Sequence, residues 1–108
     1  MIIPVIEIRE YLSAGRENAV TRDLLAAATG LSDRALRKQV EKERLSGVPI
    51  LTDSERGGYY LPSCPAETER FVKSMRRRGI RVLQVAKAVE KTMLEDMGQE
   101  RIEGWSEE

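Results

Sequence analysis

The chain has 108 residues, with 18 basic and 18 acidic side chains, one cysteine and no histidine. A single cysteine excludes an internal disulfide, and the lack of histidine excludes the usual zinc sites and histidine-dependent catalytic triads. No apolar run reaches membrane-spanning length, and Glu7 and Arg9 follow the N-terminal apolar residues too early for a signal peptide. We therefore expect a cytoplasmic, membrane-free protein that is not an enzyme and holds no metal or cofactor.

The first predicted element is a short helix from Pro4 to about Ser13. Proline suits the first position of a helix, and Val5, Ile8 and Leu12 would form its inward stripe. The polar residues 15–20, GRENAV, are expected to form a connector.

Two capped helices joined by a tight glycine turn are predicted next. Thr21 suits the N-cap of a helix ending near Thr29, Gly30 suits its left-handed C-cap, and Ser32 would cap a second helix. So short a joint sets two helices steeply against each other, as in helix-turn-helix proteins. The apolar residues expected to pack between them are Leu24, Leu25, Ala28, Leu31, Leu36 and Val40.

A two-stranded hairpin is predicted after Gly47. Residues 48–52 (VPILT) and 59–61 (YYL) are rich in strand-forming side chains, and the DSERGG sequence between them has the composition of a turn. Gly57 or Gly58 would supply the positive φ of a tight turn. Because Tyr59 and Tyr60 alternate along a strand, one ring is expected in the core and the other at the surface.

These residues resemble a known family. SDRALRKQVEKERLSGVPI followed by GGYYL is similar to the winged helix-turn-helix of the biotin-operon-repressor type, as carried by small phage and prophage proteins. The resemblance covers about the first sixty residues and implies a mainly α fold with a small two-stranded β wing, in which the second helix reads double-stranded DNA.

Six residues are candidate DNA contacts on this interpretation. Arg34 and Lys38 lie four apart on the outward line of the second helix, where arginine can read guanine and lysine can bind phosphate. The full set is Thr21, Ser32, Arg34, Arg37, Lys38 and Arg56. The alternative is that the basic face serves solubility alone. Asp53 and Glu55 beside Arg56 are expected to repel phosphate.

The second helix departs from the family pattern near its end. Glu43 stands where the family has an apolar core residue, Leu45 is turned outward, and Glu41 lies on the outward line after Lys38. Either the last turn is tightened or unwound, or another element covers this end, such as the long helix of a partner. Glu41 suits a pairing with a neighbouring cation, a contact to cytosine or a protein-binding surface.

A long amphipathic helix is predicted over residues 63–97, followed by an acidic, disordered tail over 98–108. A seven-residue repeat indicates a short coiled coil that joins two copies, with Gly79 as a point where the helix could kink. The predicted association residues are Phe71, Met75, Gly79, Val82, Ala86, Val89 and Met93. The alternative is packing of this stripe on Ile2, Ile3, Val5 and Ile8 of the same chain.

Cys64 is expected to be a half-buried linker residue rather than a redox switch.

The zero net charge hides strong segregation along the chain. The segment from Arg70 to Lys91 contains eight basic residues and one acidic residue, Glu90. The segment from Glu95 to Glu108 contains six acidic residues and one basic residue, Arg101. Such blocks indicate either solvated surfaces or extra phosphate contacts screened by the tail.

The domain organisation expected is a winged helix-turn-helix over 1–62, the association helix and the tail. The functional expectation is a homodimeric DNA-binding regulator of phage or prophage type. The alternative is a winged-helix adaptor in a replication or packaging complex.

Overall fold

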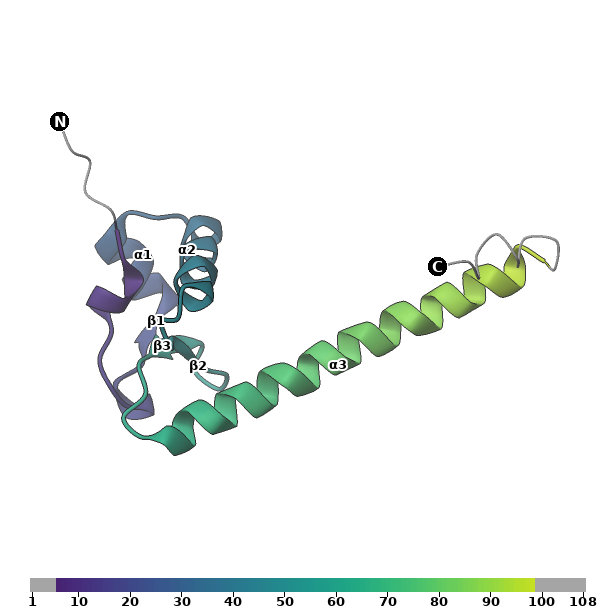
Figure 1. The fold of residues 1–108 in the computed structure, drawn as a ribbon. Helices are drawn as coiled ribbons and strands as arrows, with labels where there is room; N and C mark the ends of the chain where they lie inside the picture. The colour runs from purple at the N-terminus through teal and green to yellow at the C-terminus, as the bar shows by residue number, and fades with distance from the viewer. Residues whose placement is uncertain (1–5, 99–108) are drawn as a thin grey trace. The chain divides into compact units, whose positions relative to one another are not determined.

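The chain is mainly helical and carries a small antiparallel sheet of three strands (Figure 1). The computed structural model describes residues 6–98, and the chain divides into two units, Met1–Val72 and Lys73–Glu108. In chain order the elements are the 3-10 helices η1 (Ile8–Tyr11) and η2 (Arg16–Asn18), strand β1 (Val20–Thr21), helices α1 (Arg22–Thr29) and α2 (Asp33–Leu45), strands β2 (Leu51–Asp53) and β3 (Gly58–Tyr60), and helix α3 (Pro65–Asp96).

The predicted caps of α1 and α2 are confirmed. Thr21 Oγ1 accepts a hydrogen bond from the Leu24 amide at 3.3 Å, and Ser32 Oγ accepts one from the Ala35 amide at 3.1 Å. Gly30 ends α1 in the left-handed region, with φ of 78°, and donates its amide to the Ala26 carbonyl. The direction of the chain between the two helices therefore follows from local side-chain chemistry.

The core of the first unit lies between α1, α2, η1 and the sheet. Its buried residues are Ile8, Leu25, Leu36, Val40, Ile50 and Tyr59. The expected burial of Leu24 and Ala28 is wrong, because both are exposed and Leu24 retains 63% of its accessible surface. Since successive helical residues lie about 100° apart, only the line through Leu25 points into the core, and this short helix leaves its flanks in solvent.

The predicted two-stranded wing is a three-stranded sheet in the order β1-β3-β2. Part of the segment expected to be a connector forms β1, where Val20 pairs with Tyr59 and Thr21 with Gly58. Gly57 supplies the positive φ, 79°, of the turn, whereas Gly58 serves the close approach of β1. A Cβ at Gly58 would lie 2.9 Å from the Val20 carbonyl oxygen, so only glycine fits without movement of the backbone.

The predicted first helix is shorter and of a different type. Pro4 and Val5 lie outside the described residues, and the helical part is the single 3-10 turn η1. The chain is extended at Leu12 because Ser13 and Gly15 pair with Leu61: the Leu61 amide donates to the Ser13 carbonyl, and the Gly15 amide donates to the Leu61 carbonyl. This pairing of distant backbone groups ends the helix early.

Glu43 explains the departure from the expected apolar pattern of α2. The residue is 94% buried, and its carboxylate accepts hydrogen bonds from the amides of Ile8 at 2.6 Å and Arg9 at 3.1 Å, as well as from the Gln39 side-chain amide at 2.8 Å. The covering element is therefore η1 of the same chain, and no unwinding of α2 is needed before Leu45. Leu45 points outward as predicted, with 83% of its surface exposed.

Both tyrosines of β3 are buried, so the prediction of one surface ring is wrong. The two rings lie on opposite faces of β3, and other parts of the chain cover both faces. Tyr59 packs in the core, while burial raises the pKa of the Tyr60 phenol, which also feels the charges of Glu67 and Arg16. Alternation along a strand places side chains on two faces, but it leaves one exposed only where nothing packs on that face.

Helix α3 is continuous through Gly79, and the predicted long helix is confirmed to within two residues at each end. It begins at Pro65, in keeping with the preference of proline for the first helical position. Cys64, immediately before it, is exposed rather than half-buried. The predicted tail lies outside the described residues from 99 onward.

Candidate nucleic-acid interface

The exposed face of α2 carries a row of cations spaced one helical turn apart. Arg34, Lys38 and Lys42 all lie at the surface, and none makes an ion pair with another side chain in the described part of the chain. Lys42 was not among the predicted contacts, although its spacing of four from Lys38 could have indicated it. The opposite face of α2 is buried through Leu36 and Val40, which fixes the direction in which the cations point.

Arg37 differs from the cations of this row because it is paired. Its Nε lies 3.1 Å from Asp33 Oδ2, and Arg22 Nε of α1 lies 3.8 Å from Asp33 Oδ1. Asp33 therefore neutralises part of the charge of two arginines and links the two helices. All three side chains remain substantially exposed, so these contacts stabilise the fold only slightly and can be exchanged for a phosphate.

Thr21 and Ser32 lie at the N-termini of α1 and α2, where their hydroxyl oxygens already accept backbone amides. Each hydroxyl retains its own proton as a donor. The two residues therefore cap their helices and can also donate to a phosphate oxygen.

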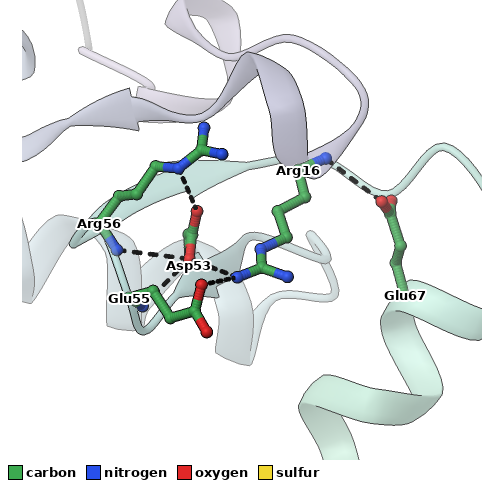
Figure 2. Close-up of polar contacts among 5 residues, drawn as sticks. All are labelled: Arg16, Asp53, Glu55, Arg56 and Glu67. Carbon is green, nitrogen blue, oxygen red and sulfur yellow. Dashed lines mark hydrogen bonds and ion pairs between the residues drawn. The ribbon is translucent and has the colours of Figure 1, made fainter.

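Arg56, in the turn between β2 and β3, is held by Asp53 (Figure 2). Asp53 is almost fully buried, and its Oδ1 accepts the amides of Glu55 at 3.1 Å and Arg56 at 3.4 Å. Its Oδ2 makes no hydrogen bond and lies 3.7 Å from Arg56 Nε. The turn is thus organised around one buried carboxylate, while 66% of the Arg56 side chain remains exposed.

Arg16 is the residue that the sequence did not single out. Its Nη2 lies 3.3 Å from Asp53 Oδ1 and 2.7 Å from Glu55 Oε1, as Figure 2 shows. Burial raises the pKa of Asp53, but the hydrogen bonds from Arg16 and from the two turn amides outweigh it, so the pKa of Asp53 is below its usual value. The expected repulsion of phosphate by Asp53 and Glu55 is therefore reduced, because Arg16 offsets part of their combined charge.

Glu67 joins the start of α3 to this cluster. Its Oε1 accepts the Ser63 amide at 2.8 Å and the Ser63 hydroxyl at 3.1 Å. Its Oε2 accepts the Arg16 amide at 3.2 Å, as Figure 2 shows. The Ser63 amide is the main reason that the pKa of Glu67 lies below its usual value. The first turn of α3 is thereby fastened to η2.

Arg44 is a structural cation rather than part of the exposed row. Its Nε donates to the Ile50 carbonyl at 2.7 Å and its Nη2 to Thr52 Oγ1 at 2.8 Å, while its guanidinium lies 4.8 Å from the centre of the Phe71 ring. Phe71, predicted to be an association residue, is therefore half-buried and already in contact with its own chain.

The other predicted association residues, Met75, Gly79, Val82, Ala86, Val89 and Met93, are exposed. Of the residues proposed to cover them within the chain, Ile8 is instead in the core of the first unit, and Ile2, Ile3 and Val5 lie outside the described residues. Among the described residues, this apolar stripe on α3 is therefore exposed.

Comparison of the chain with protein-family models, with curated proteins and with solved structures finds no match. None of the helices described between residues 6 and 98 is both long and apolar enough for a membrane span. Over the same residues, no group of three or more His, Cys, Asp or Glu side chains is placed to hold a metal ion.

Proposed function

We propose that the chain is a winged helix-turn-helix protein that binds double-stranded DNA, with α2 as its recognition helix. The observation that carries this proposal is the exposed row Arg34, Lys38 and Lys42, which lacks ion-pair partners among the described residues. Most other arginines of the first unit are engaged: Arg9, Arg16, Arg22, Arg37 and Arg56 pair with carboxylates. Cations without counter-charges on a helix that follows a three-residue joint suit the phosphates and base edges of the major groove.

The residues of this surface have different roles in the proposed complex. Arg34, near the start of α2, is suited to a guanine edge through two parallel hydrogen bonds. Lys38 and Lys42 bind phosphates, as do the hydroxyl protons of Thr21 and Ser32. Arg37 exchanges Asp33 for a phosphate. Arg56 contacts the backbone from the turn of the wing, oriented by its contact with Asp53.

The proposed biological unit is a homodimer formed through α3, and its role is that of a transcriptional regulator of phage or prophage type. The exposed apolar stripe on α3 supports the dimer. Two recognition helices would then read a pseudo-palindromic site with half-sites one helical turn apart, or a multiple of it.

Titration of the purified chain onto a randomised pool of duplex DNA, followed by selection of a preferred site, tests the proposal. Arg34→Ala should weaken binding to the selected site by about 1 to 3 kcal/mol and relax one base preference. Lys38→Ala should weaken binding to all sequences and lower the slope of affinity against salt concentration by about one. Arg9→Ala, which removes an exposed arginine of η1, is the control and should leave binding unchanged. Wild-type affinity in both α2 variants would contradict the placement of α2 in the groove.

A second candidate function is that of a winged-helix adaptor that binds a protein. The observation in its favour is that Glu41 and Leu45 lie on the same exposed face of α2 as Lys38, so this face combines cations with an acid and a large apolar side chain. A failure to bind duplex DNA even at low salt would favour this adaptor function over the regulator.

A further inference from the structure

The distribution of large and small side chains along the exposed stripe of α3 distinguishes parallel from antiparallel pairing with a second copy. The stripe belongs to the unit Lys73–Glu108 and repeats every seven residues. One seam position is occupied by Met75, Val82 and Val89, and the other by Gly79, Ala86 and Met93. The first seam position thus carries only large side chains. At the second seam position, two of the three side chains are small.

In a parallel pair, each layer of the seam would be formed by the same residue from both copies. Gly79 would then face Gly79, and Ala86 would face Ala86, leaving the layers on either side of the Val82 layer with too little side-chain volume. Voids of this kind cost stability because the lining atoms lose their contacts. The parallel arrangement therefore uses the stripe poorly.

In an antiparallel pair, each layer combines one residue from each seam position. Gly79 then faces Val89 of the second copy, and Ala86 faces Val82 of the second copy. Open space surrounds the position that a Cβ on Gly79 would occupy, so a valine can enter there. Small residues meet large ones in both layers, which is the complementarity that a packed core requires.

The residues that flank the seam agree with the same arrangement. In the antiparallel register that forms those layers, Leu83 lies beside Leu83 of the second copy and Val85 beside Val85 of the second copy. Both side chains are exposed in the single chain. The same register brings Arg76 close to Glu90 of the second copy, whereas a parallel pair would place Leu83 beside Arg78 and Glu90 beside Val85. Only the antiparallel pair therefore places opposite charges next to each other and apolar side chains next to each other.

We propose that the chain associates with a second copy through antiparallel pairing of α3, centred near Gln84. This inference rests on the dimer of the proposed function and adds the orientation of the pair and its contacts. Arg76 and Glu90 determine the orientation, while Gly79 and Ala86 permit the close approach of the helices.

Distances between spin labels test the orientation directly. Arg77, Gln84 and Lys91 are exposed, and a spacing of seven places them on one line of the helix opposite the stripe. In Cys64→Ser protein, a single cysteine at each position in turn carries a nitroxide. For an antiparallel pair the separation should be shortest at position 84, and it should be longer at 77 and 91, where the labels are offset along the axis by about 21 Å. A parallel pair would give nearly equal separations at all three positions and would overturn the proposal.

A charge exchange gives an independent measurement. Arg76→Glu should weaken dimerisation roughly tenfold, because two cross-copy attractions become repulsions. Arg76→Glu combined with Glu90→Arg should restore it. The two positions lie fourteen residues apart on one helix, too far for contact within a copy. Arg81→Glu, on the outer face, is the matched control and should change dimerisation little. No restoration in the double variant would contradict the proposed register.

Sedimentation at micromolar concentration separates the failure of this inference from the failure of the proposed function. A dimer with equal label separations would refute only the antiparallel orientation. A monomer throughout would refute both this pairing and the dimeric part of the proposed function. Binding of duplex DNA by such a monomer would leave the assignment of α2 as the recognition helix in place.

Discussion

Replacing Asp53 with asparagine tests whether one buried carboxylate organises the turn between β2 and β3. The side chain keeps its size, and its remaining carbonyl oxygen can still accept the amides of Glu55 and Arg56. What is lost is the negative charge beside Arg16 and Arg56. The variant therefore isolates the ionic part of the contact from its hydrogen bonds to the backbone.

The expected loss of stability in Asp53→Asn follows from the burial of the Asp53 carboxylate and the partial exposure of Arg16. A hydrogen bond to a charged group contributes roughly 1.5 to 3 kcal/mol, but 39% of the Arg16 side chain is exposed and regains water when its partner is neutral. We expect Asp53→Asn to lower the free energy of unfolding by about 1 to 2 kcal/mol. Asp53→Ala, which also leaves the two turn amides without an acceptor, should cost about 3 kcal/mol.

The same contact predicts the pH dependence of stability. Because the pKa of Asp53 is lower in the folded chain than in the unfolded chain, its contribution is complete above the unfolded pKa of about 4 and is lost as the pH falls through the folded pKa. The difference in stability between wild type and Asp53→Asn should therefore be constant above about pH 5 and should narrow below pH 4. The pKa of Glu67 is also lowered, so the stability of Asp53→Asn should still fall somewhat as the pH falls.

Urea denaturation followed by circular dichroism, at one fixed protein concentration, measures these differences. Glu55→Gln is the control: its carboxylate makes the shorter contact with Arg16, 2.7 Å, but 78% of the side chain is exposed. Its loss should cost less than about 0.5 kcal/mol. If Glu55→Gln cost as much as Asp53→Asn, or if the pH dependence were identical in wild type and Asp53→Asn, burial would not be what gives Asp53 its importance.

Three further predictions concern the caps and the association stripe. Gly30→Ala should lower the free energy of unfolding by about 1 kcal/mol, measured by urea denaturation, because φ of 78° disfavours a side chain although the space for it is open. Glu43→Ala should cost about 2 to 4 kcal/mol in the same assay because it leaves the amides of Ile8 and Arg9 without acceptors, whereas Glu43→Gln, which keeps one acceptor oxygen, should cost less. Val82→Glu should convert the proposed dimer to monomers in sedimentation experiments, while the first unit still unfolds cooperatively when followed by circular dichroism; an unchanged dimer would contradict burial of Val82.

Local chemistry made several elements predictable from the sequence. Thr21, Gly30 and Ser32 act on amides and dihedral angles within a few residues of themselves, so their positions alone define the start of both helices and the joint between them. The length of α3 was equally predictable, since no strong helix breaker follows Pro65 until Gly98. The outward placement of Arg34 and Lys38 followed from helical periodicity once the buried line through Leu36 was identified.

Other features depend on groups that are far apart in the sequence, and only the tertiary structure decided them. Strand β1 exists because Gly58 lets Val20 approach β3, and Glu43 is buried because the amides of η1, 34 and 35 residues away, need an acceptor. Arg16 gained its importance in the same way, through a carboxylate on β2. Caps and helical faces are set by neighbours along the chain, whereas a polar residue is buried only when distant partners satisfy it, and the sequence pattern does not specify those partners.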